Sequence, residues 1–264
     1  LQQRGRGEDE VQRVHLDRHL DAVVALTQEC ALWIKKHSSA RHVPIIPNAV
    51  MWPLPDHPPR IQPDSLLQSG RKVLLAVGRL NKVKNLSSLV QAFSQLAAQQ
   101  AEWDLVLLGE GPERPLLESM VRNAGLGQRV FMPGIAGNVG DWYARADLYV
   151  MTSHSEGFPN TLAEALAHGI PAVSVDCDTG PRDIIRHETD GLLVPPGDAS
   201  ALMDALDRLM GNDGLRHAFA AKALDARERF SVEHITGRWE ELFHDLARER
   251  FPSTSAGKAQ ALHR

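Results

Sequence analysis

The stretch from Leu148 to Val175 reads LYVMTSHSEGFPNTLAEALAHGIPAVSV, and it decides the fold. It begins with the apolar run Leu148 to Met151 and ends with a second run, Ala172 to Val175. Between them, the apolar residues of Thr161 to His168 recur at helical spacing. A strand, a helix and a second strand in this order predict one crossover unit of a parallel sheet.

The same alternation continues on both sides of this unit. Further strands are predicted at Val73 to Val77, Leu105 to Leu108, Val130 to Met132 and Leu192 to Val194. Further helices are predicted at Leu86 to Ala98, Glu113 to Ala124, Val139 to Arg145 and Arg182 to Arg186. The pattern indicates an α/β fold with a Rossmann-like, doubly wound parallel sheet over about residues 68–200. Ligands of such sheets bind where strands end and loops turn into helices.

The segments before and after the predicted sheet have a different sequence pattern. A helix is predicted over Val11 to Lys36 and a short strand over Val43 to Ile46, and the proline-rich segment Met51 to Ser65 favours an extended linker. C-terminal helices are predicted over Ala199 to Met210, Leu215 to Arg229 and Val232 to Arg248. The first residue is not Met and the chain opens in polar sequence, so we expect a fragment of a longer protein.

Composition narrows the class of protein. The chain has 264 residues, 43% of them hydrophobic and 23% charged, with a formal net charge of −4. No basic block is present of the kind that nucleic-acid binding needs, so no nucleic-acid partner is expected. The two cysteines, Cys30 and Cys177, suggest neither a disulfide framework nor a zinc site and favour a reducing, cytoplasmic setting.

Glycine and positive charge follow the first predicted strand of the sheet. Residues 78–85 read GRLNKVKN. Gly78 permits tight backbone geometry at a strand end, and Arg79 and Lys84 place two cations beside the start of a helix, where free N–H groups already favour anions. We interpret these cations either as a clamp for a diphosphate or as solvated loop charges.

Two carboxylates follow the fourth strand. Glu156 lies in the loop and Glu164 lies about one turn into the next helix, so both can face a ligand at the helix N-terminus. A carboxylate can accept two hydroxyl hydrogen bonds, which suits a sugar or a ribose. The alternative for Glu164 is a capping box with Thr161, in which the carboxylate bonds only the cap N–H. The alternative for Glu156 is an exposed loop carboxylate.

The remaining strand-end loops give weaker signals. Gly109-Glu110-Gly111-Pro112 is interpreted as a plain turn into a helix, and Pro133-Gly134 as a turn that can expose backbone groups. Asp176 and Asp178 follow the fifth strand. Two carboxylates are too few oxygen ligands for a hard cation, so turn capping is the favoured interpretation and no metal is expected.

Together these loops resemble the C-terminal domain of family 4 glycosyltransferases, which have the GT-B fold. Gly78-Arg79-Leu80 with Lys84 is similar to the G-R-L-x-x-x-K element, residues 156–165 fit the E-x7-E element, and residues 190–198 resemble the closing N-G-x-L-V-x-x-x-D element. The resemblance covers about residues 20–248. It departs at Asn85, where glycine is frequent, and at residues 179–183, which look like the turn of enzymes that use UDP-hexoses or UDP-N-acetylhexosamines.

The resemblance implies roles for particular residues. Arg79 and Lys84 would neutralise the diphosphate of a nucleotide-sugar donor, and Glu156 would contact hydroxyls of the transferred sugar. Glu164 would hold the ribose hydroxyls. The other implied donor-binding residues are Gly78, Gly134, Ile135, Gly157, Phe158, Pro159, Asn160, Thr161 and Leu162. Such enzymes usually retain anomeric configuration and need neither a cofactor nor a metal.

The resemblance also implies a domain plan and a function. Residues 1–50 would be a remnant of an N-terminal, acceptor-side domain, 51–67 the interdomain linker and 68–230 the donor-binding domain. Residues 231–250 would be a C-terminal crossover helix and 251–264 a disordered tail. The expected enzyme transfers a hexose or N-acetylhexosamine to a glycan or lipid-linked acceptor in the cytoplasm or at the inner face of the membrane. The alternatives are a nucleotide-sugar-binding fragment without activity and a sugar-nucleotide epimerase.

Overall fold

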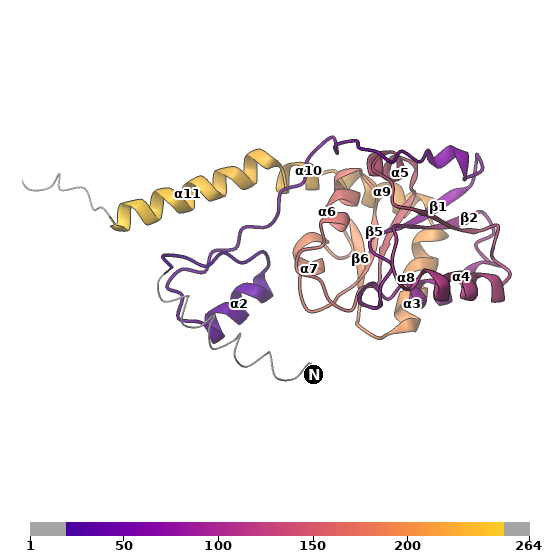
Figure 1. The fold of residues 1–264 in the computed structure, drawn as a ribbon, viewed down its shortest axis with the longest axis horizontal. Coiled ribbons are helices and arrows are strands. Elements are labelled where there is room, and N and C mark those ends of the chain that lie inside the picture. The colour runs from indigo at the N-terminus through magenta and orange to yellow at the C-terminus, as the bar shows by residue number, and fades with distance from the viewer. Residues whose placement is uncertain (1–19, 251–264) are drawn as a thin grey trace, which may run out of the picture.

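The computed structural model describes residues 20–250, which centre on a six-stranded parallel sheet (Figure 1). Its strand order is β3-β2-β1-β4-β5-β6. The strands are β1 (Lys72–Val77), β2 (Trp103–Leu108), β3 (Val130–Gly134), β4 (Leu148–Met151), β5 (Ala172–Val175) and β6 (Gly191–Val194). The order reverses between β1 and β4, which is the doubly wound topology that the sequence predicts.

Helices cover both faces of this sheet. The helices within residues 20–250 are α2 (Gln28–His37), α3 (Leu86–Leu96), α4 (Arg114–Asn123), α5 (Val139–Arg145), α6 (Asn160–Ala167), α7 (Pro181–Ile184), α8 (Ala199–Met210), α9 (Asp213–Ala223), α10 (Ala226–Arg229) and α11 (Val232–Arg250). Short 3₁₀ turns lie at Pro63–Ser65 and Lys82–Lys84. Within residues 20–250, no helix combines the length and the apolar character that crossing a membrane requires.

Alternate residues of each strand belong to opposite cores. Leu74 and Ala76 of β1 pack with α3, α4 and α8, whereas Val73 and Leu75 pack with α5 and α6 on the other face. All six residues of β2 are buried. Strands buried on both faces read as continuous apolar runs rather than alternating ones, which is why they could be identified from the sequence.

Most predicted bounds lie close to the observed ones. The bounds of β4, β5, α5 and α8 agree with the prediction. Asp198 caps α8 and Ser231 caps α11, since their side chains accept hydrogen bonds from the N–H groups of Ala201 and His234. The single helix predicted over 215–229 is wrong. The chain turns at residues 224–225 and forms α9 and α10 instead.

The segment before the sheet differs more. The predicted helix over Val11 to Lys36 is wrong for residues 20–27, and its first part lies outside the described residues. Thr27 caps α2, and Ala25 is extended because it pairs with the chain near Ile45, accepting the N–H of Ile46 at 2.8 Å. The strand predicted at Val43 to Ile46 is likewise reduced to this one isolated bridge.

The proline-rich segment lies along the sheet unit. The N–H of His57 donates to the carbonyl of Gly137 at 3.2 Å, and the N–H of Gly137 donates to the carbonyl of Pro59 at 2.6 Å. The ring of Trp52 packs edge-on against His168, with 4.3 Å between the ring centroids. This segment therefore contacts two loops of the unit that it precedes. At the C-terminal end of the described residues, α11 projects away from the sheet (Figure 1).

Candidate functional site

The loops after β1 and β4 meet where the strand order reverses. Thr152, at the end of β4, is buried and its hydroxyl lies 3.0 Å from the carbonyl oxygen of Lys84 and 3.1 Å from that of Asn85. The N–H of His154 donates to the carbonyl of Val83 at 2.8 Å. These bonds hold the two loops together at the position where doubly wound sheets bind their ligands.

An ion pair joins two of the predicted site residues at this junction. Lys84 Nζ lies 2.6 Å from Glu156 Oε1, and both side chains are largely buried. A Cβ atom on Gly78 would lie 3.3 Å from Lys84 Cε. The Lys84 side chain therefore packs over the bare backbone of Gly78, which places its ammonium group beside the end of β1.

Backbone geometry accounts for the residues between Gly78 and α3. The Asn81 side chain accepts the N–H of Lys84 at 3.1 Å and caps the short turn that carries this lysine. Asn85 then adopts the left-handed conformation, with φ at 49° and ψ at 41°. Asparagine tolerates this region better than most residues do. Asparagine at position 85 therefore adopts the same left-handed conformation that glycine would allow there.

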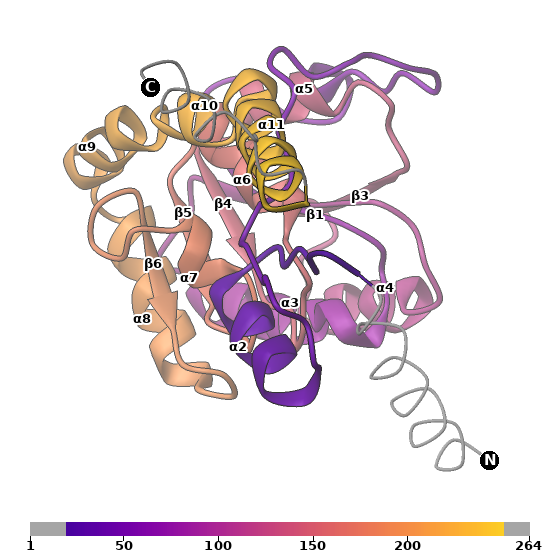
Figure 2. The same cartoon turned by 90° about the vertical axis from the view of Figure 1, so that its left-hand side faces the viewer.

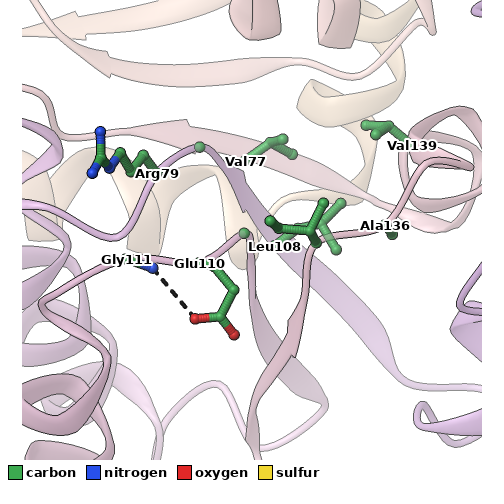
Figure 3. A pocket seen from close by; sticks show the side chains of 10 residues that line it. Val77, Arg79, Leu108, Glu110, Gly111, Ala136 and Val139 are labelled. Atoms are coloured by element: carbon green, nitrogen blue, oxygen red, sulfur yellow. Dashed lines mark hydrogen bonds between the residues drawn. The ribbon is translucent and has the colours of Figure 1, made fainter. Parts of the chain in front are cut away.

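A pocket of about 500 Å³ opens beside this junction (Figure 3). Its lining residues come from the ends of β1, β2 and β3 and from the start of α5, and they are Val77, Gly78, Arg79, Leu108, Gly109, Glu110, Gly111, Ile135, Ala136 and Val139. Three predicted site residues, Gly78, Arg79 and Ile135, are among them. Arg79 is exposed and lies at the end of the pocket away from Val139.

The loop after β2, which was predicted to be a plain turn, also lines this pocket. A Cβ atom on Gly109 would lie 2.0 Å from the carbonyl oxygen of Gly78, and one on Gly111 would lie 2.2 Å from that of Leu80. The two loops therefore approach so closely that only glycine fits. The Gly-x-Gly spacing after a strand was the available signal, but a plain turn has the same spacing. Glu110, between the two glycines, pairs with Arg114.

Glu164 is not part of a capping box. The cap of α6 is Pro159, without a side-chain bond, and Asn160 and Thr161 do not cap the helix either. The Tyr143 hydroxyl instead donates to Glu164 Oε2 at 2.9 Å. Burial raises the pKa of the Glu164 carboxyl, while the hydrogen bond from Tyr143 acts in the opposite direction.

The predicted residues between these two carboxylates are divided between surface and core. Gly157 and Asn160 are exposed, and Asn160 Oδ1 accepts a hydrogen bond from Asn48. Thr161 Oγ1 accepts one from Tyr149, and Phe158 and Leu162 are buried in the core. Leu162 is fully buried, so only its backbone groups could meet a ligand.

The loop after β5 supports the one after β4. A Cβ atom on Gly180 would lie 2.5 Å from Pro159 Cδ, so glycine is needed for this packing, and Pro159 is itself buried. The Asp176 carboxylate binds Arg182 through two hydrogen bonds of 2.9 Å. Among residues 20–250 there is no group of three or more His, Cys, Asp or Glu side chains placed to hold a metal.

Several known proteins are similar to this chain. An exopolysaccharide phosphotransferase of Streptomyces coelicolor is 36% identical over 88% of the chain and 24% of the relative. The N-acetyl-α-D-glucosaminyl L-malate synthase of Bacillus anthracis is 28% identical over 69% of the chain and 48% of the relative. The chain spans between about a quarter and a half of the length of these two relatives.

Solved structures share the fold. A sucrose-phosphate synthase from Thermosynechococcus elongatus superposes with a TM-score of 0.78 at 24% identity, over 94% of this chain and 64% of that one. Anabaena HepE in complex with UDP superposes with a TM-score of 0.79 at 22% identity, over 90% of this chain and 68% of that one. The family model described as "Glycosyl transferases group 1" matches residues 59–225. The doubly wound sheet, the junction of its strand-end loops and this match over more than half of the chain show that the chain belongs to the group 1 glycosyl transferases, with one Rossmann-like half of a GT-B fold.

Proposed function

We propose that this chain is the donor half of a retaining glycosyltransferase that transfers a hexose or N-acetylhexosamine from a UDP-sugar to a glycan or lipid-linked acceptor. The observation that carries the proposal is the Lys84–Glu156 pair, 2.6 Å apart at the point where the strand order reverses and next to a pocket of about 500 Å³. A cation, a carboxylate and an apolar pocket side by side suit the diphosphate, the transferred sugar and the base of a nucleotide sugar.

Each part of the donor has a partner in this proposal. The apolar pocket, with Ile135 and the backbone after β3, takes the base. Arg79 and Lys84 face the diphosphate, and Glu156 contacts the transferred sugar. Glu164 accepts the ribose hydroxyls through a carboxylate that is partly buried. UDP is chosen because HepE, with the same fold, was solved with UDP.

The chemistry follows from the charges. Transfer breaks the bond between the anomeric carbon and the phosphate oxygen, so negative charge grows on the departing UDP. Arg79 and Lys84 supply positive charge at that point, an electrostatic stabilisation that preorganised groups provide effectively. The proposal therefore needs no metal ion. The acceptor would be held by a part of the protein beyond this chain, near the inner face of the membrane when it is lipid-linked.

The 36% sequence identity to an exopolysaccharide phosphotransferase favours a second candidate function. A phosphotransferase that moves a sugar phosphate from a UDP-sugar breaks the bond between the two phosphates and releases UMP. A glycosyltransferase breaks the bond to the sugar and releases UDP. The released nucleotide therefore distinguishes the two reactions.

The test of the donor site is a calorimetric titration of UDP into the chain and two lysine variants. Lys84→Ala is expected to raise the Kd for UDP by about 10- to 100-fold, the usual effect of losing a hydrogen bond to a charged group. Lys82→Ala is the matched control, because Lys82 lies in the same turn and is exposed. It removes the same charge and is expected to change the Kd by less than about twofold.

Two outcomes would contradict the proposal. One is no UDP binding by the unaltered chain, and the other is an equal loss of affinity in both lysine variants, which would indicate a diffuse charge effect. A transfer assay with a UDP-sugar, with and without the native N-terminal part, then separates an enzyme from a module that only binds. Release of UMP rather than UDP would favour the phosphotransferase.

A further inference from the structure

The hydroxyl of Tyr143 is aimed at one oxygen of Glu164. Tyr143 lies on α5 and Glu164 on α6, and the hydroxyl donates to Glu164 Oε2 at 2.9 Å. A second acceptor, the carbonyl oxygen of Thr161, lies 3.1 Å from the same hydroxyl. One hydroxyl hydrogen can serve only one of them at a time, and a bond to an ionised carboxylate is the stronger.

Packing leaves the Tyr143 ring little freedom. The side chain is fully buried. Its ring lies 4.9 Å from that of His168 and 6.2 Å from that of Tyr149, measured between centroids. His168 is held in turn, because its Nδ1 donates to the carbonyl of Glu164 at 2.8 Å and its other side meets Trp52. The phenolic oxygen therefore has a fixed place from which it contacts Glu164.

The orientation of the Glu164 carboxylate depends on this contact with the Tyr143 hydroxyl. Its carboxylate is partly buried, and among residues 20–250 no hydrogen bond is formed by the other oxygen, Oε1. When one oxygen of a carboxylate is held by a hydrogen bond, the other oxygen points in a fixed direction and can accept a bond from a ligand. Precise orientation of a binding group requires support from residues behind it.

We propose that Tyr143 is a positioning residue, whose hydroxyl holds the Glu164 carboxylate in the orientation that accepts the ribose hydroxyls of the donor. The inference rests on the proposed function, because it takes Glu164 as the ribose-binding group. Tyr143 itself does not touch the donor. It acts through Glu164.

The same bond also affects the pKa of Glu164. Burial raises the pKa of Glu164, and the hydrogen bond from Tyr143 lowers it again. Burial also raises the pKa of Tyr143 well above its ordinary value, so this hydroxyl stays protonated and remains a donor. An ionised Glu164 accepts ribose hydroxyls, so UDP binding through it weakens as the pH falls through its pKa.

The other titratable groups near Glu164 come from three elements. Tyr149 on β4 is fully buried, and burial raises its pKa above the ordinary value, with the charge of Glu164 adding to this effect. His168, directly after α6, has its pKa lowered by burial, and Arg227 on α10 contributes to that decrease. Among the described residues, none of these three side chains donates to the Glu164 carboxylate, whereas Tyr143 does.

The test measures the Kd for UDP across pH in the variants Tyr143→Phe and Tyr149→Phe. The second is a matched control: it removes an equally buried hydroxyl from the neighbouring ring, but that hydroxyl donates to Thr161 Oγ1 at 2.8 Å rather than to Glu164. Glu164→Gln supplies the reference in which Glu164 does not titrate, since the phosphates of UDP also titrate near pH 6. The unfolding temperature of each variant is measured alongside.

Tyr143→Phe is expected to raise the Kd at neutral pH by about 3- to 10-fold, the range for one net hydrogen bond. It also raises the pKa of Glu164 further, so the loss of binding in acid begins at a higher pH than in the unaltered chain. In Tyr149→Phe any change in Kd is the same at every pH. In the Glu164→Gln background, Tyr143→Phe has no further effect on the Kd.

The results separate the two proposals. If the unaltered chain does not bind UDP, both are overturned. If it binds and Glu164→Gln weakens binding, but Tyr143→Phe leaves the Kd and its pH dependence unchanged, only the positioning role is overturned. The same holds if Tyr143→Phe and Tyr149→Phe lower the unfolding temperature and the affinity equally, because that result describes a structural role.

Discussion

At the scale of single residues, Asn85 links the two halves of the site. Its left-handed backbone turns the chain from the Lys84 turn into α3, and its carbonyl oxygen is one of the two next to the Thr152 hydroxyl. Its own side-chain oxygen accepts a hydrogen bond from Ser88 at 2.8 Å. The position thus has a conformational requirement and a side-chain contact that substitutions can separate.

We predict that Asn85→Ala lowers the free energy of unfolding by about 1–2 kcal/mol, the cost of placing an alanine in the left-handed region. Asn85→Gly is expected to lie within about 0.5 kcal/mol of the unaltered chain, because glycine adopts this region freely. Urea unfolding measures both, with Ser88→Ala as the control for the lost hydrogen bond. Equal losses in the alanine and glycine variants would show that the side-chain contact, not the backbone, determines stability here.

The same scale explains which site residues the sequence could identify. Gly78 and Lys84 lie between β1 and α3, and Glu156 lies between β4 and α6, so a correct strand assignment was enough to bring them together. Their roles toward a ligand stay predictions. The surroundings of Glu164 could not be predicted, because its partner Tyr143 lies 21 residues away and a local pattern matched a capping box equally well.

At the scale of elements, Asn138 attaches the proline-rich segment to the loop after β3. Its buried side chain accepts the N–H of Ile61 at 2.9 Å and donates to the carbonyl of Ile61 at 3.1 Å. A further bond reaches Asp141 at 2.8 Å. One side chain therefore replaces the backbone pairing that a strand would have supplied to this segment.

Asn138→Ala is expected to lower the free energy of unfolding by about 1–3 kcal/mol, because it leaves the backbone groups of Ile61 without partners. Amide hydrogen exchange should show faster exchange at Ile61 in this variant. Asn123→Ala, at an exposed position at the end of α4, is the control and should be near neutral. Unchanged exchange at Ile61 would show that other contacts hold the segment.

A helix or strand could be predicted where its own residues show that it is buried, without knowledge of its partners. The strands β1, β2, β4 and β5 are largely buried on both faces, so each one appears as an apolar run whatever its neighbours are. Ala25 and Ile45 instead form a single bridge, with α2 between them in the sequence. Its two partners lie far apart in the sequence, and the helical spacing of nearby apolar residues predicted a helix where the chain is extended.

At the scale of the molecule, residues 20–47 and α11 lie together on one side of the sheet unit (Figure 2). Arg238 on α11 donates to the carbonyl oxygen of Ile45. Toward the sheet unit, Glu29 on α2 pairs with Arg182 on α7 at 3.4 Å. Beside it, Glu29 Oε2 and Asp183 Oδ2 are buried without a hydrogen-bond partner among the described residues. The carboxylates of Glu29 and Asp183 thus meet where the segment of residues 20–47, called here the N-terminal segment, contacts α7.

This contact should depend on pH. Burial, with the charge of Glu29 next in importance, raises the pKa of Asp183 from 3.8 to about 6. The folded chain therefore holds this proton more tightly than the unfolded chain does. The stabilisation that the proton provides is complete below about pH 4 and is lost as the pH rises through 6. Above pH 6 the contact joins two negative charges.

We therefore predict that Asp183→Asn raises the unfolding temperature at pH 7.5 by about 2–4 °C, which corresponds to about 1 kcal/mol in a chain of this size. The gain is smaller than the full pKa shift implies, because Asp183 is only partly buried and solvent screens it. Thermal unfolding from pH 4 to pH 8 should show the difference between variant and unaltered chain shrinking toward pH 4. Asp178→Asn removes the same charge from an exposed position and should give no such pH dependence. A constant difference at every pH would mean that the Asp183 carboxyl does not interact with the charge of Glu29.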